Sequence, residues 1–300
     1  MKIPKSSGAS TAGMLVATGA ISIQFGAAFA TRLFREVGPT GATALRIVFA
    51  AIALLSFNWR RGINISKLRA RRKDVMVAVG FGIVLGTMNL TFYESISRIP
   101  LGVAVTIEFV GPLSVTIFGS RKASDLLWAL LAGVGVFLLA GGSLFGHIHR
   151  LDIVGVLFAL AAGLCWIGYI LLNSASGKRF GGTTGLTIAM SAASVVILPF
   201  GLASAGLHLF NPGILLIGVT VALLSSAIPY SLEMHALKRI TPRAFGILLS
   251  LDPVFAALAG LFILNQHLDI YEIVALVLVM TANAGSAYFD SQSEKTKVST

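Results

Sequence analysis

The amino-acid sequence predicts an all-α membrane protein with ten transmembrane helices, arranged as two inverted repeats of five helices. Three observations lead to this prediction: an apolar composition, ten apolar runs, and a block of sequence that occurs twice. The 300 residues are 56% hydrophobic and only 12% charged, whereas a soluble domain carries about 25% charged residues. Because a chain of this length cannot bury so much apolar surface, the composition excludes a soluble fold.

The apolar runs are the first element of the prediction. A transmembrane helix needs about 20 mostly apolar residues, and charges and turn residues divide the chain into ten such runs. The runs cover roughly residues 12–32, 40–57, 75–96, 101–119, 124–142, 152–174, 184–206, 213–235, 243–264 and 270–289. Their connections are short, except for the basic segment 58–74.

The positive charges predict the orientation of these spans. The net charge of +11 would suit a nucleic-acid partner, but the charges lie in the short connections, where the positive-inside rule explains them. With a cytoplasmic N-terminus, cytoplasmic segments hold 18 Lys and Arg residues and outer segments hold 4. We therefore expect an even number of spans in the bacterial inner membrane, both termini in the cytoplasm, and no nucleic-acid partner.

A duplicated block predicts the two repeats. Residues 93–119 align without gaps over 234–260, and the alignment places Arg98 over Arg239 and Pro112 over Pro253. The chain then divides into halves, 1–147 and 148–300, and an odd number of spans in each half inverts the second half. Inverted repeats are typical of secondary transporters, whose substrate site lies near the bilayer midplane. A duplicated but inert helical bundle is the alternative.

Charged side chains inside spans mark candidate functional positions, since such charges are costly there. The candidates are Arg46, Glu94, Glu108, Glu233 and Asp252. Counting at about 1.5 Å per residue places Arg46 and Glu108 at one depth, about 10 Å below the outer surface. A guanidinium and a carboxylate at one depth suit a small zwitterionic substrate. A structural Arg46–Glu108 pair, or an Arg46 side chain that reaches outward to water, are the alternatives.

Other polar and aromatic side chains extend this set. Gln24, Asn89 and Tyr93 fall in the same outer layer, and a second set is expected toward the cytoplasmic side: Trp166, Tyr169, Ser225, Ser226, Tyr230, Glu233, Ser250 and Asp252. Together the two layers would form a pathway across the bilayer. The alternatives are packing roles for the aromatic residues and, for Glu233 and Asp252, ion pairs with Lys238 or Arg243 at the rim.

Helix breaks are predicted at equivalent places in the two repeats. Gly111 and Pro112 interrupt one span and Pro253 interrupts its counterpart. Because proline removes a main-chain hydrogen bond, matched interruptions indicate a binding site lined by freed carbonyl groups.

Signals for an enzyme are weak. The sequence has no cofactor fingerprint or zinc spacing, and the pair His147 and His149 lies in a polar outer connection. We therefore predict no enzymatic activity, no metal and no cofactor. The chain carries no signal for an oligomeric state.

Four blocks give the chain a family resemblance: SIQFGAAFATRLF (22–34), GATALRIVFA (41–50), PLGVAVTIEFVGPLSV (100–115) and AIPYSLEMHALKRITPRAFGILLSLDPVFAALAG (227–260). The ten-span layout resembles the EamA branch of the drug/metabolite transporter superfamily, and the blocks resemble its bacterial threonine/homoserine exporters. The matching positions are Gln24, Arg46, Glu108, Tyr230, Glu233 and Asp252. The family block has Glu where this chain has Asp252, a side chain shorter by one methylene.

The resemblance implies export of threonine, homoserine or related small amino acids in exchange for protons. In this hypothesis the two halves rock about a central site, and a partly desolvated Glu108 exchanges its proton for the substrate ammonium. Glu233 ranks second for the proton-coupling role. The alternatives are an uncoupled facilitator and an exporter of another small metabolite, such as an aromatic amino acid, a nucleoside or a drug.

Overall fold

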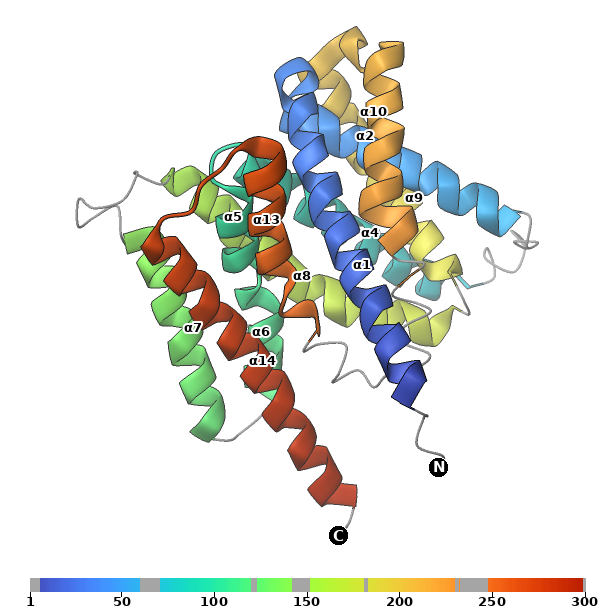
Figure 1. The fold of residues 1–300 in the computed structure, drawn as a ribbon. Coiled ribbons are helices and arrows are strands. Elements are labelled where there is room, and N and C mark those ends of the chain that lie inside the picture. The colour runs from blue at the N-terminus through green and yellow to red at the C-terminus, as the bar shows by residue number, and fades with distance from the viewer. Residues whose placement is uncertain are drawn as a thin grey trace.

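The computed structural model describes residues 6–59, 71–119, 123–141, 152–180, 183–229, 232 and 248–298, and all regular elements within these ranges are helices (Figure 1). The helices are α1 (Ser6–Ala30), η1 (Thr31–Leu33), α2 (Phe34–Trp59), α4 (Arg72–Ile96), α5 (Leu101–Glu108), α6 (Val110–Gly119), α7 (Ala123–Gly141), α8 (Ile153–Arg179), α9 (Thr184–Ala205), η2 (Gly206–Phe210), α10 (Pro212–Ala222), η3 (Leu223–Ala227), α13 (Asp252–Leu264) and α14 (Ile270–Val298). The all-α prediction is confirmed for these residues.

The first two apolar runs form one nearly continuous helical path. The 3₁₀ turn η1 joins α1 directly to α2, and α2 bends at Gly38, whose φ is 68° and ψ is 169°. A positive φ suits glycine, which has no Cβ to clash with the backbone. Pro39 follows and restarts the helix, because its ring fixes φ near −65°. The regular helix therefore begins at Pro39, close to residue 40, where the apolar run was expected to begin.

The described helices pack in pairs that join the two halves of the sequence. α4 packs along α8 and α2 along α9, and α4 also contacts α9, so these four helices form one group of neighbours. α7 packs along α14 at one side, and α5 packs against α13 beside them (Figure 1). Helices of the first half thus find their main partners in the second half.

The α6–α8 contact shows how closely two helices approach. A Cβ added to Gly111 would overlap the main-chain carbonyl of Gly163, and a Cβ added to Gly163 would lie 2.8 Å from the carbonyl oxygen of Glu108. Small residues at such crossings let two backbones approach in a membrane protein. This contact fixes the position of Glu108 against α8.

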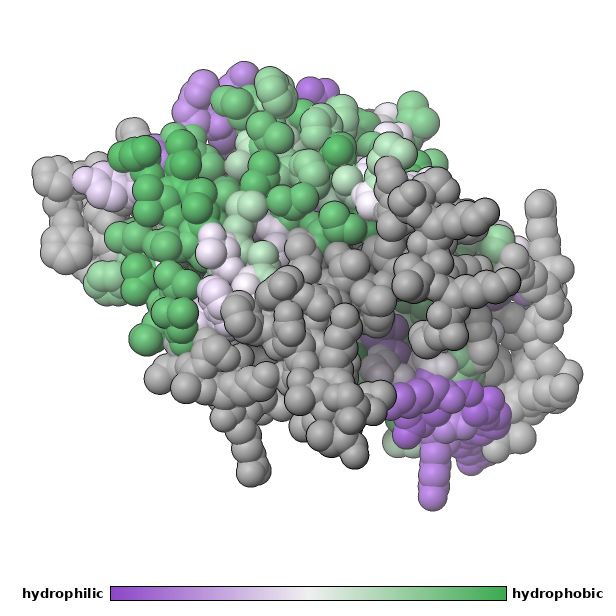
Figure 2. Space-filling model, turned by 60° about the horizontal axis from the view of Figure 1, so that its bottom comes forward, coloured by the Kyte–Doolittle hydropathy of each residue, from purple (hydrophilic) through white to green (hydrophobic). Residues whose placement is uncertain are grey.

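The outer surface of the bundle is apolar. On α8 the exposed large side chains Ile153, Leu157, Leu164 and Leu171 lie on one face, each at least 59% exposed. Figure 2 shows a broad apolar area with hydrophilic side chains gathered at its edges. Among the described residues, four helical stretches have the length and composition to cross a membrane: Gly13–Trp59, Arg72–Ile96, Ile153–Arg179 and Thr184–Phe210. Because exposed apolar surface of this extent requires an apolar medium, the protein is a membrane protein.

Candidate functional site

Arg46 is the buried cation of the candidate site. It lies in the middle of α2 and is only 8% exposed. Its Nη1 atom donates a hydrogen bond to the hydroxyl of Tyr93 on α4 at 3.4 Å, and its Nη2 atom donates to the carbonyl oxygen of Ser225 at 3.2 Å. The guanidinium also lies over the Tyr93 ring, with 5.4 Å between Cζ and the ring centroid. Arg46 therefore joins two helices of the first half to one element of the second half.

Ser225 belongs to a widened turn. The element η3 is a π-helical turn, in which the Ile228 N–H donates to the carbonyl of Leu223, five residues earlier. Pro229 follows this turn and has no N–H, so it cannot bond the carbonyl four residues earlier, at Ser225, or five residues earlier, at Leu224. Side chains of the first half bind both carbonyls: Arg46 donates to Ser225, and the Ser22 hydroxyl donates to Leu224 at 2.7 Å.

Glu108 is the buried carboxylate of the site. It is the last residue of α5 and is 7% exposed. The helix is interrupted at Phe109 and resumes as α6, and Pro112 cannot donate to the Glu108 carbonyl four residues before it. Arg46 and Asp252 both lie within electrostatic range of the carboxylate. Glu108 thus shares its surroundings with one positive and one negative side chain.

The structural Arg46–Glu108 pair is not formed. In the described part of the chain no ion pair of 4.0 Å or less joins them; the ion pairs found there are Arg71–Asp74, Arg98–Glu94 and Arg179–Asp74. Arg46 also does not reach outward to water, since it is buried against Tyr93 and Ser225. The guanidinium and the carboxylate therefore lie near each other without direct contact.

The separation into two polar layers is wrong for Ser225 and Asp252. Both were expected in a cytoplasmic layer away from Arg46 and Glu108, but Ser225 bonds Arg46 and Asp252 acts on Glu108. Counting along straight helices misplaced Ser225 because α10 continues into the π-helical turn η3. It misplaced Asp252 because the described helix α13 begins at this residue, with Leu251 as its N-cap and Pro253 in its first turn. Ser225 and Asp252 therefore belong to the surroundings of Arg46 and Glu108.

The remaining predicted residues lie at different positions. Asn89 on α4 is 6% exposed and donates to the Leu85 carbonyl of its own helix at 2.8 Å. On α8, the Trp166 ring packs edge-on against Phe109, next to Glu108, at a centroid distance of 4.9 Å, and the Tyr169 ring lies 5.4 Å from that of Phe81. Tyr230 and Glu233 fall outside the described residues.

Gln24 lies on α1 and is 4% exposed. Its neighbours Ser22 and Gly26 are one turn apart and face η3, so Gln24, about 200° around the helix from Ser22, lies on the other side of α1. The structure does not bring it into hydrogen-bonding contact with Arg46. α1 packs against α13 as well as η3, which gives Gln24 a place between the two halves.

Several buried polar atoms in these elements are unsatisfied. Among the described residues, Oε1 of Gln24 and the Oγ atoms of Ser225 and Ser226 have no hydrogen-bond partner. Buried polar atoms are normally hydrogen-bonded, so such atoms call for water or a ligand.

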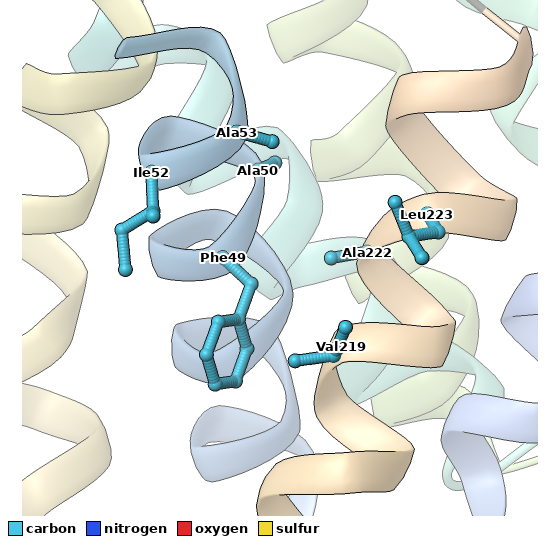
Figure 3. A pocket seen from close by; sticks show the side chains of 7 residues that line it. All are labelled: Phe49, Ala50, Ile52, Ala53, Val219, Ala222 and Leu223. Atoms are coloured by element: carbon cyan, nitrogen blue, oxygen red, sulfur yellow. The ribbon is translucent and has the colours of Figure 1, made fainter. Parts of the chain in front are cut away.

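An apolar groove lies beside the site but does not belong to it. Figure 3 shows the side chains that line this groove, which come from α2 on one side and from α10 and the start of η3 on the other. Its lining is entirely apolar: Phe49, Ala50, Ile52, Ala53, Val219, Ala222 and Leu223. A groove without polar groups cannot bind a zwitterion, because each charge would lose its hydration without a partner.

The arrangement can bind a ligand that carries both charges. The guanidinium of Arg46 can pair with a carboxylate, and the carboxylate of Glu108 can accept hydrogen bonds from an ammonium group. Sequence reasoning selected both residues because they are charges within apolar runs. It did not select Pro229, although a proline four residues after Ser225 in SSAIP indicates a carbonyl without its helical partner.

Comparisons with known proteins agree with this picture. The model of the EamA-like transporter family matches the chain twice, at residues 10–145 and 153–287. The threonine/homoserine exporter RhtA of Salmonella typhimurium strain LT2 is 40% identical over 268 residues, 88% of this chain and 87% of that protein. RhtA of Escherichia coli K12 is 39% identical over 279 residues, 92% of this chain and 91% of that protein.

A solved crystal structure has the same fold. It matches with a TM-score of 0.59 and 18% identity, over 95% of this chain and 99% of that chain. At this identity the likeness concerns the fold alone. The family resemblance expected from the four sequence blocks is confirmed by the family model and the RhtA relatives, which are named as exporters and not as enzymes.

Proposed function

Because the chain belongs to the EamA-like transporter family, we propose that it exports small zwitterionic amino acids, threonine and homoserine among them, across the bacterial inner membrane. The observation that carries this proposal is that Arg46 and Glu108 are both buried near the junction of the two halves and form no ion pair with each other. The names of the RhtA relatives support the choice of substrates.

The proposed architecture has ten spans, with the halves 1–147 and 148–300 inserted in opposite orientations and both termini in the cytoplasm. The helix contacts support two equivalent halves, because contacts occur in matching sets. The first helix of each half packs on the fourth span of the other half: α1 packs on α13, and α8 packs on α5 and α6. The second helices, α2 and α9, pack on each other, as do the fifth, α7 and α14.

In the proposed site Arg46 binds the substrate carboxylate and Glu108 binds its ammonium group. Tyr93 holds the guanidinium from one side, and Trp166 packs next to Glu108 through Phe109. Gln24, Asn89, Tyr169 and Tyr230 complete the set of substrate-binding residues in this proposal. The predicted helix breaks at Gly111, Pro112 and Pro253 complete the proposed site: Gly111 and Pro112 follow the interruption at Phe109, and Pro253 lies in the first turn of α13.

Proton coupling is proposed at Glu108, with Glu233 as a second coupling residue. Glu108 releases its proton toward the cytoplasm and then binds the substrate ammonium, and it is protonated again after the substrate leaves outward. One carboxylate that serves both ligands enforces their exchange. Since the described site residues are buried, the two halves must move to open the site alternately to each side.

A counterflow assay tests the substrate assignment. Purified protein is reconstituted in liposomes that contain unlabelled threonine, and entry of labelled threonine from a dilute outer solution is followed. The proposal predicts transient accumulation, which homoserine suppresses and which tryptophan or adenosine leaves unchanged. Suppression by tryptophan or adenosine but not by homoserine would instead identify an exporter of another metabolite class and overturn the proposal.

A further inference from the structure

Pro229 has no N–H to offer the Ser225 carbonyl, four residues earlier, or the Leu224 carbonyl, five residues earlier, and side chains of the other half of the protein donate to both carbonyls. Ser22 on α1 bonds Leu224, and Arg46 on α2 bonds Ser225. Neither donor lies in the helix that contains the turn. A break of this kind is tolerated inside a membrane protein only when other groups satisfy the carbonyls, and here one of those groups is the proposed carboxylate-binding cation.

The contacts of Arg46 define the direction of its guanidinium. The Tyr93 ring supports its face, the Tyr93 hydroxyl accepts from Nη1, and the Ser225 carbonyl accepts from Nη2. A guanidinium has five N–H donors in a planar fork, so these two bonds leave donors for a ligand. Fixing the plane of the fork in advance lowers the cost of ordering it when a carboxylate binds.

We propose that Pro229 is a positioning residue for substrate recognition: by leaving the Ser225 carbonyl open, it makes this carbonyl a fixed acceptor that orients Arg46 toward the substrate carboxylate. The inference rests on the proposed function, because it assumes that Arg46 binds the carboxylate. In this proposal Pro229 matters for the choice of ligand as well as for the hydrogen bonding of the helix.

The competing explanation is purely structural. In that case Pro229 only bends the chain, and replacing it changes folding or turnover for every ligand alike. The two explanations differ in one property: a positioning role acts on the carboxylate of the ligand and on no other group. L-Threoninol provides the matched ligand, since it keeps the ammonium and the side-chain hydroxyl of threonine but carries CH₂OH in place of the carboxylate.

The experiment compares threonine with threoninol in reconstituted protein. The KM for labelled threonine and the inhibition constant of threoninol are measured for wild type, Pro229→Ala and Arg46→Lys. Alanine restores an N–H at position 229 that can bond the Ser225 carbonyl in place of Arg46. We expect the KM for threonine to rise about five- to tenfold in Pro229→Ala, the factor that corresponds to the net contribution of one ordinary hydrogen bond. The inhibition constant of threoninol should stay unchanged.

Two controls separate positioning from folding. Pro212→Ala makes the same chemical change at the first turn of α10, where a proline removes no internal helical bond, and its KM should equal that of the wild type. In the double variant with Arg46→Lys, the Pro229→Ala change should add nothing further, because both act through the same contact. Thermal melting of each variant in detergent reports loss of fold directly.

The outcomes distinguish the two proposals. If Pro229→Ala raises the threonine KM and the threoninol constant by the same factor, or adds its full effect to Arg46→Lys, the positioning role is wrong. If Pro229→Ala has the same melting temperature and the same KM for threonine as the wild type, the positioning role is wrong as well. If the wild type transports neither threonine nor homoserine, the proposed function itself fails, and this result is independent of the variants.

Discussion

The guanidinium of Arg46 lies over the ring of Tyr93, with 5.4 Å between Cζ and the ring centroid, while its Nη1 atom donates to the hydroxyl of the same residue at 3.4 Å. Tyr93 therefore makes two interactions with the Arg46 guanidinium, one through its ring face and one through its hydroxyl. The hydroxyl bond is longer than the usual N–H···O distance of about 2.9–3.0 Å, so we expect the ring to contribute more than the hydroxyl.

This relationship predicts unequal effects of two substitutions at Tyr93. Tyr93→Phe keeps the cation–π contact and loses only the long hydrogen bond, so the KM for threonine should rise by less than about threefold. Tyr93→Leu also removes the cation–π contact, which is worth about 2 kcal/mol when desolvated, and the KM should rise by about tenfold or more. Phe92→Leu is the control, because Phe92 contacts the Tyr93 ring and is not stacked with Arg46. Equal effects of Phe and Leu at position 93 would contradict the cation–π role.

The backbone contact between α6 and α8 predicts a loss of stability on adding one methyl group. In Gly163→Ala the new Cβ would lie 2.8 Å from the carbonyl oxygen of Glu108, and overpacking of this kind costs about 1–3 kcal/mol. The melting temperature in detergent should fall. Gly177→Ala, on the same helix, meets no atom within 4 Å, and its melting temperature should stay unchanged or rise. An unchanged melting temperature of Gly163→Ala would show that α8 can move away from Glu108 at little cost.

A polar network joins the end of α2 to the start of α9. The Asn58 amide donates to the Thr187 hydroxyl at 2.8 Å, and the Thr183 hydroxyl donates to the Asn58 carbonyl oxygen at 2.9 Å. Asn58→Ala removes both bonds between the helices and should lower the free energy of unfolding by about 1–2 kcal/mol.

The matched control for Asn58 is Asn283→Ala. Asn283 is buried, and its side-chain amide donates to the Val279 carbonyl of its own helix. Loss of this bond therefore removes no hydrogen bond between two helices. Urea or thermal unfolding of the two variants in detergent compares them directly. A larger loss for Asn283→Ala than for Asn58→Ala would contradict the role of the network at this end of the bundle.

The sequence predicts the position of a helix well where a single apolar run forms the whole helix. The predicted run 75–96 lies within α4, and run 184–206 coincides closely with α9, because length and apolarity are local properties. Run 40–57 matches the part of α2 that follows the kink at Gly38, because Pro39 restarts the helix there. Within run 243–264 the described residues are helical at 248–249 and again in α13, with a turn at Ser250 and Leu251 between them.

The site was predicted less completely than the fold. Arg46 and Glu108 could be selected because a charge in an apolar run is expensive, and both are buried. Their relation to Ser225 and Asp252 could not be predicted by counting residues, because it depends on the π-helical turn and on which helices cross. The side chains that donate to η3 belong to Ser22 and Arg46, which lie 202 and 179 residues before their acceptors in the chain. No local sequence pattern predicts contacts over such separations.

The central claim is that Glu108 couples the export of a zwitterion to proton entry. The most direct test uses inside-out membrane vesicles with an acid interior and follows uptake of labelled threonine and homoserine by wild type, Glu108→Gln and Glu94→Gln. Glu94 is the control carboxylate, since it pairs with Arg98 at 2.6 Å near the end of α4. We predict uptake that the pH gradient drives in wild type and Glu94→Gln and that is lost in Glu108→Gln. Uptake by the wild type that is the same with and without the gradient, or gradient-driven uptake that persists in Glu108→Gln, would contradict the account.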